Sequence, residues 1–142
     1  MDLHIRELTA PDLHRGFLEA LAALTEVALT PQEAIPILQH RLRAGVRTFI
    51  AVHCDRVVGT ASLFIEPKFI HRGGKVGHIE DVAVHRDFQR RGIGTALVQH
   101  ATEEARKLGC YKVILYCFDH LVPFYARLGY RPYNAGLRLD LG

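Results

Sequence analysis

A chain of 142 residues, 49% hydrophobic and 23% charged, has the size of a single domain. It contains no run near the roughly 20 apolar residues of a membrane span, and its start lacks the pattern of a secretory signal, so we expect a soluble cytoplasmic protein with no membrane partner. The 18 Lys and Arg against 15 Asp and Glu give a net charge of +3 spread along the chain, which does not favour nucleic acid.

The first third of the chain predicts one strand and two helices. Residues 3–8 have strand character, and Thr9 and Pro11 then begin a helical pattern that runs to about Ala28. Residues 30–44 predict a second helix, because a hydroxyl cap, a proline at the first helical position and a glutamate three residues after the cap stand together in Thr30-Pro31-Gln32-Glu33.

The middle of the chain predicts a sheet. Residues 48–53 and 57–65 are rich in β-branched and aromatic residues and flank Asp55-Arg56, which is typical of a hairpin. Residues 77–85 are apolar at both parities, as in a central strand that is covered on both faces.

The last third predicts a helix over residues 95–108, with Gly109 just past its end, and a strand over residues 111–117. A short helix at 121–128 and one or two terminal strands around Pro132 and Asn134 complete the pattern. The elements together predict one mixed α/β domain, residues 1–142, with helices on both sides of a sheet.

The turn before the third long helix carries the strongest chemical signal. Two glycines at the start of a helix let backbone amides converge on one point, where the helix dipole adds positive potential, and two arginines stand beside them in Gln89-Arg90-Arg91-Gly92-Ile93-Gly94. A diphosphate suits such a place. The alternative is an ordinary strand-to-helix turn. The turn lacks the third glycine of a dinucleotide fingerprint and the lysine of a P-loop.

Gln-x-x-Gly-x-Gly opening a helix resembles the pyrophosphate signature of GNAT acetyltransferases, a family with a mixed, mostly antiparallel sheet. The segments 77–84, 109–115, Phe124-Tyr125 and Gly129-Tyr130 look like glucosamine 6-phosphate N-acetyltransferases. The resemblance covers about residue 25 to the end and implies transfer of an acetyl group from acetyl-CoA to a primary amine. The cofactor-binding residues that it implies are Val82, Ala83, Val84, Gln89, Arg90, Arg91, Gly92, Ile93, Gly94 and Thr95.

Tyr125 matches the family tyrosine whose hydroxyl faces the CoA sulfur. A phenol with a pKa of about 10 stays neutral at working pH and can donate to a departing thiolate. A tyrosine that only packs a short helix is the alternative. Glu80 is the expected proton acceptor for the attacking amine, with Asp81 as the other candidate, although both acids fit the solvated end of a strand equally well.

The same match implies an acceptor site made of Thr25, Lys68, His71, Glu80, Asp81 and Tyr116. Two departures concern the acceptor. Tyr116 stands where the family has an aspartate, and the near-terminal basic residue of the family has no counterpart, although Arg138 or Arg131 could replace it. The favoured acceptor is an amino sugar phosphate such as glucosamine 6-phosphate. Another small amine, a protein amine, or acyl-CoA binding without turnover are the alternatives.

The cysteines and histidines do not predict a metal or a disulfide. Cys54, Cys110 and Cys117 are an odd number without paired spacing, and the nine histidines form no ligand pair backed by an acid or a sulfur. Cys117 is interpreted as a core residue rather than a nucleophile in a covalent relay. The matched family is dimeric with substrate residues from both subunits, so we also expect a homodimer.

Overall fold

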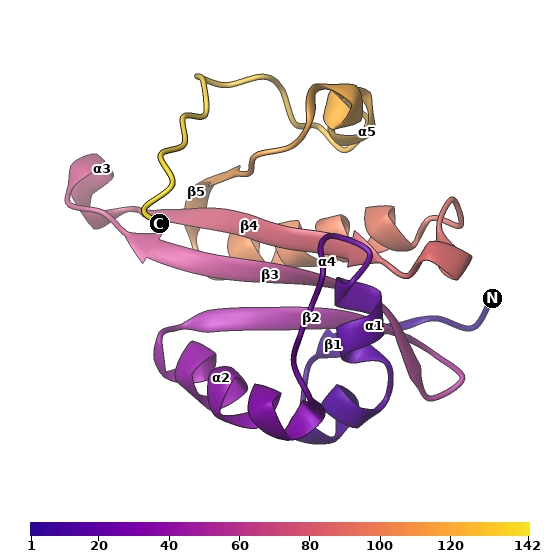
Figure 1. Ribbon diagram of the computed structural model, residues 1–142. Helices are drawn as coiled ribbons and strands as arrows, with labels where there is room; N and C mark the ends of the chain where they lie inside the picture. The colour runs from indigo at the N-terminus through magenta and orange to yellow at the C-terminus, as the bar shows by residue number, and fades with distance from the viewer.

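The computed structural model describes residues 1–142 and contains one five-stranded sheet. The strands pair in sequence order, antiparallel from β1 to β4 and parallel between β4 and β5. Their bounds are β1 His4–Glu7, β2 Val46–His53, β3 Arg56–Pro67, β4 Lys75–Val84 and β5 Cys110–Ile114. The predicted mixed, mostly antiparallel sheet and the 48–65 hairpin are therefore confirmed (Figure 1).

Five helices accompany the sheet, and three of them pack on its faces. They are α1 Phe17–Leu21, α2 Pro31–Arg43, α3 Ile70–Gly73, α4 Ile93–Lys107 and α5 Val122–Ala126. Helices α1 and α2 lie on one face of the sheet and α4 on the other (Figure 1). The predicted arrangement of helices on both faces is confirmed.

The core beneath α4 depends on close approach of the helix to β3. An added Cβ at Gly59 would lie 2.9 Å from Leu97 Cδ1 and 3.0 Å from Ile93 Cγ2, so only glycine allows this spacing. Ala101 and Ala105 are also fully buried along the same side of the helix. The start of α4 is consequently held in a fixed position beside the end of β4.

The second core lies between α1, α2 and the opposite face, where Ile50 and Leu38 are buried. The predicted cap of α2 is present. Thr30 Oγ1 accepts from the Glu33 amide at 3.2 Å, and Glu33 Oε1 accepts from the Thr30 amide at 3.0 Å.

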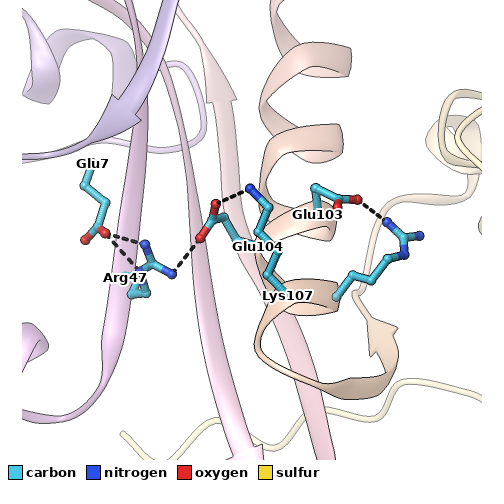
Figure 2. A network of polar contacts seen from close by, with 6 residues as sticks. Glu7, Arg47, Glu103, Glu104 and Lys107 are labelled. Carbon is cyan, nitrogen blue, oxygen red and sulfur yellow. Dashed lines mark hydrogen bonds and ion pairs between the residues drawn. The ribbon is translucent and has the colours of Figure 1, made fainter.

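Arg47 links three elements at one end of the sheet (Figure 2). Its guanidinium on β2 donates to Glu7 on β1 and, at 3.0 Å, to Glu104 Oε2 on α4. Glu104 also pairs with Lys107 at 3.7 Å. The network ties the edge of the sheet to the helix that begins at the candidate site.

Two predicted elements are wrong. The first helix does not run to Ala28, because Gly16 with φ 98° separates a 3-10 turn from α1, and α1 ends at Leu21. The chain must also be extended at Thr30 (ψ 158°) to cap α2 before Pro31. The terminal strands are absent, since residues 131–142 have no strand partner within this chain.

Candidate functional site

The site begins where β4 and β5 separate. Their last paired residues are His78 and Ile114, so β5 ends before the predicted Cys117. The interpretation of Cys117 as a core residue is wrong, because beyond the end of the strand its side chain is exposed. Beyond this point β4 continues to Val84 with β3 on one side only, which leaves main-chain groups on its other edge without a strand neighbour. An extended ligand can pair with such an edge as an added strand.

A bulge bends β4 inside this free segment. Thr60 pairs with Ala83 and Ser62 with Glu80, so β4 has one residue more than β3 over the same length. Asp81 takes the left-handed conformation with φ 50°. The bulge changes the direction of the main chain at Glu80 and Asp81, immediately before Val82.

The separated strands enclose a cleft of about 360 Å³. Its lining is mainly apolar and includes five of the predicted site residues, Glu80, Asp81, Val82, Tyr116 and Tyr125. The other lining residues are Leu24, Ile79, Leu115, Cys117, Phe118 and Leu121. Residues from the α1–α2 connection, β4, the segment after β5 and α5 therefore meet in one place.

Tyr125 is the most buried polar side chain of the cleft, with 8% of its surface exposed. Burial is the main cause that raises its pKa to about 12, with a smaller contribution from Cys117. The rings of Phe124 and Tyr130 pack edge-on against it at centroid distances of 4.9 and 6.1 Å. The phenol is thus held in place and neutral at physiological pH.

The start of α4 has several free amides. The first main-chain bond of the helix runs from the Ala96 amide to the Gly92 carbonyl at 3.0 Å, and no side chain caps the helix. The amides of Ile93, Gly94 and Thr95 consequently have no main-chain acceptor. Gly92 has φ 79°, which allows the sharp entry into the helix.

The remaining residues of this turn are arranged around it. Gln89 Nε2 donates to the Val84 carbonyl at 3.0 Å, so the turn is attached to the end of β4. Arg90 and Arg91 are exposed, and the Arg91 guanidinium lies 5.3 Å from the centre of the Phe88 ring. Amides, helix dipole and two cations at one place suit a pyrophosphate.

Three of the predicted acceptor residues lie outside the cleft. Lys68 and His71 are at the far tip of the β3–β4 hairpin. Lys68 Nζ pairs with Glu66 at 3.3 Å, and the His71 ring packs at a tilt against Tyr111 with 4.1 Å between the ring centroids. Thr25 is in the exposed connection after α1, next to the cleft residue Leu24. The chain alone does not bring these three residues into one pocket with Glu80.

Lys112 is a cation that the sequence patterns did not single out. Its Nζ contacts the Tyr133 hydroxyl at 3.0 Å, and this hydrogen bond is the main cause that lowers the pKa of Tyr133. Lys68 lowers the same pKa by its charge, so the two lysines are close to one phenol. The signal available beforehand was only its position in the 109–115 segment, because surface lysines on strands are common.

The comparisons with known proteins agree on one family. The model of the acetyltransferase (GNAT) family matches residues 10–130. A glucosamine 6-phosphate N-acetyltransferase of Trypanosoma brucei brucei is 44% identical over 144 residues, covering 99% of this chain and 97% of the relative. A probable glucosamine 6-phosphate N-acetyltransferase of Oryza sativa subsp. japonica is 38% identical, covering 90% of this chain and 81% of the relative.

Solved structures give the same result. The crystal structure of glucosamine-6-phosphate N-acetyltransferase from Arabidopsis thaliana has a TM-score of 0.94 at 28% identity and covers 100% of both chains. That of a Trypanosoma brucei acetyltransferase has a TM-score of 0.92 at 44% identity, covering 99% of this chain and 100% of the other.

Proposed function

Because this chain belongs to the GNAT acetyltransferase family, we propose that it transfers the acetyl group of acetyl-CoA to the amine of an amino sugar phosphate, with glucosamine 6-phosphate as the leading acceptor. Two observations carry the proposal: the cleft between β4 and β5, which contains a buried tyrosine, and the free amides at the start of α4, where Gly94 lies against Val84 and Phe124. The 44% identical relative supports the choice of acceptor.

The residues present fit acetyl-CoA, which supplies the acetyl thioester when it is bound. The free edge of β4 at Val82, Ala83 and Val84 can hydrogen-bond the amide-containing arm of such a ligand. The turn at residues 89–95 binds its pyrophosphate through main-chain amides. The bond between Gln89 and Val84 keeps these two parts of the site in register.

Tyr125 stabilises the leaving group. Attack of an amine on a thioester expels a thiolate, which is stabilised by a hydrogen bond or a proton from a nearby donor. A phenol with a pKa of about 12 remains protonated at every physiological pH, so its hydroxyl is always a donor. Its hydroxyl has no hydrogen-bond partner in the chain and is available for this role.

The attacking amine must lose a proton, and we assign its acceptor to the bulge of β4. Glu80 and Asp81 both line the cleft and both are exposed. The bulge leaves Asp81 without a partner in the ladder, so its main-chain carbonyl can orient the ammonium while the Glu80 carboxylate receives the proton through water.

The phosphate of the acceptor is assigned to the tip of the β3–β4 hairpin. Lys68 and His71 supply the predicted cations, and Lys112 adds a third, which lies with Lys68 near the Tyr133 phenol. Tyr116 lines the cleft with a bulky phenol where the family has a carboxylate, so it contacts the sugar by packing rather than by charge. Thr25 approaches from the α1–α2 connection.

A homodimer completes this site in the proposal. Leu137, Leu139 and Leu141 alternate with polar residues, as in a strand, and are 96%, 83% and 93% exposed. An extended segment with this alternation can form a strand by joining another sheet, and a second copy offers the same free edges. We assign the protein to the cytoplasm, which suits its three free thiols.

A substrate panel tests the proposed function. Steady-state rates with acetyl-CoA should be compared for glucosamine 6-phosphate, glucosamine, polyamines and peptide amines. The phosphorylated sugar should have the highest kcat/KM, and Lys68→Ala should raise its KM while Arg43→Ala on α2 does not. If another amine is preferred, the acceptor is wrong but acetyl transfer stands. If no amine releases free thiol, the chain is a non-catalytic acyl-CoA-binding module.

A further inference from the structure

Three polar side chains form a short chain of contacts beside the cleft. Glu66 Oε1 lies 2.9 Å from His78 Nε2, and Glu66 Oε2 lies 3.3 Å from Lys68 Nζ. The contact with His78 is the main cause that lowers the pKa of the Glu66 carboxyl. A charged carboxylate therefore fixes the orientation of the His78 ring.

His78 lies on the same face of β4 as Glu80. An added Cβ at Gly77 would lie 3.1 Å from Ala105 of α4, and Ile79 belongs to the core beneath that helix. Because side chains alternate along a strand, His78 and Glu80 point to the opposite face. They are two residues apart, which is roughly 7 Å along a strand.

This position is between the two ends of the acceptor site. Glu80 and the bulge are at the proposed amine end, and Lys68 reaches back from the hairpin tip at the proposed phosphate end. His78 and Glu66 lie on the sheet between these two ends, where the ring of an amino sugar phosphate would lie. Phe64 pairs with His78 across the strands, is 37% exposed, and offers an apolar surface to the same space.

The hydrogen-bonding capacity of His78 is defined by its partner. A carboxylate only accepts, so Nε2 carries the proton that faces Glu66. In the neutral ring Nδ1 is then an acceptor, and no hydrogen bond within the chain uses it. The side chain is 23% exposed, so a ligand can reach it. A sugar hydroxyl is a donor that suits this nitrogen.

We propose that His78, oriented by Glu66, is a specificity-determining residue that accepts a hydrogen bond from a ring hydroxyl of the amino sugar phosphate. The inference rests on the proposed function, and it adds a contact to the middle of the acceptor between the amine and the phosphate. Glu66 is a positioning residue, because it acts through the imidazole.

The test uses glucosamine 6-phosphate and its 3-deoxy and 4-deoxy analogues with the full chain. In the wild type, one analogue should have a KM about 10-fold above that of the parent sugar, since a site built to accept a hydroxyl rejects a ligand without it. His78→Phe should raise the KM of the parent sugar about 10-fold and bring the ratio of the analogue KM to the parent KM close to one. The kcat and the KM of acetyl-CoA should change less than twofold.

Two further variants separate recognition from a structural role. Glu66→Gln should give a smaller rise in the same KM, because the ring keeps its hydrogen bond but loses the charged partner. His40→Phe, on the exposed side of α2, should leave the KM values and the ratio unchanged.

Equal KM ratios in wild type and His78→Phe for both analogues would overturn the inference. A wild type that does not discriminate between the three sugars would also overturn it. So would a His78→Phe protein in which the KM rises equally for all three sugars and the melting temperature falls. If the wild type fails to acetylate the parent sugar, the acceptor assignment itself fails, and this inference fails with it.

Discussion

Gln89 reaches back from the turn before α4 and donates from Nε2 to the main-chain carbonyl of Val84 at 3.0 Å. The bond connects the last residue of β4 to the first residue of the predicted pyrophosphate turn. The free edge of β4 and the turn before α4, which would hold opposite ends of the cofactor arm, are therefore directly connected. The glutamine of the motif has a structural reason to be present, which is independent of any direct contact with the ligand.

Gln89→Ala should weaken binding of acetyl-CoA by about tenfold, because it removes one hydrogen bond and frees the turn from β4. Calorimetric titration of the variant with acetyl-CoA measures the loss. Gln99→Ala, on the exposed side of α4, is the matched control and should bind as the wild type does. Unchanged affinity in Gln89→Ala would show that the turn keeps its conformation without this bond.

Gly94 should tolerate a small side chain but not a large one. An added Cβ would be 3.5 Å from Phe124 Cζ and 3.7 Å from Val84 Cγ2, which are ordinary contacts. Gly94→Ala should therefore bind acetyl-CoA with nearly wild-type affinity, while Gly94→Leu obstructs the approach of the pyrophosphate to the amides. Titration of both proteins tests this. Equal affinities for the leucine variant and the wild type would exclude the turn as the pyrophosphate site.

Tyr125→Phe should lower kcat by about 10²-fold, the low end of the range for general acid catalysis, with a smaller change in affinity for acetyl-CoA. Because burial raises the pKa of Tyr125 to about 12, its hydroxyl does not titrate between pH 6 and pH 10. The dependence of kcat on pH should thus have the same shape in the wild type and in Tyr125→Phe over this range. A basic limb that disappears in Tyr125→Phe would contradict the neutral phenol.

Local patterns predicted most of the fold, and long-range contacts determined the remainder. The α2 cap was readable because its donor and acceptor are three residues apart in Thr30 and Glu33. The end of α1 was not predictable in this way, since it depends on the path that the chain takes to reach the cap of α2. The terminal leucines have a strand pattern, yet a strand exists only where another strand pairs with it, and sequence alone does not identify the partner.

The candidate site shows the same division. Tyr125, Glu80, Asp81 and Tyr116 were identified by their motifs, and they meet in one cleft. The contact of His78 with Glu66 joins residues 12 positions apart on different strands, so it depends on the β3–β4 register and has no local signal. The bulge at Asp81 likewise follows from pairing rather than from composition.

Asp12 should make stability depend on pH in the acid range. The paired Arg6 guanidinium, at 2.8 Å, is the main cause that lowers the pKa of the buried Asp12 carboxyl to about 2. A carboxyl with a depressed pKa stabilises the fold above its unfolded pKa of about 4, and this contribution, about 2 kcal/mol, is lost as the pH falls toward 2. Urea unfolding at pH 7 and pH 3 should show the loss. In Asp12→Asn the difference between the two pH values should be smaller, and an equal difference would contradict the assignment.

The C-terminal leucines should hold two copies together. Leu139 is 83% exposed in the single chain, and its neighbours two residues away in the strand pattern are exposed as well, so a partner that covers them removes a continuous apolar row from water. Leu139→Asp places a charge in that row and should convert a dimer into a monomer at micromolar concentration, as measured by light scattering. Leu42→Asp, at an exposed leucine of α2, is the control and should leave the mass unchanged. Since Lys112 of the proposed phosphate end contacts Tyr133, just before this segment, the monomeric variant should also have a raised KM for glucosamine 6-phosphate while its affinity for acetyl-CoA is kept. A wild type that is monomeric, or a Leu139→Asp protein that stays dimeric with an unchanged KM, would show that these residues do not form the interface.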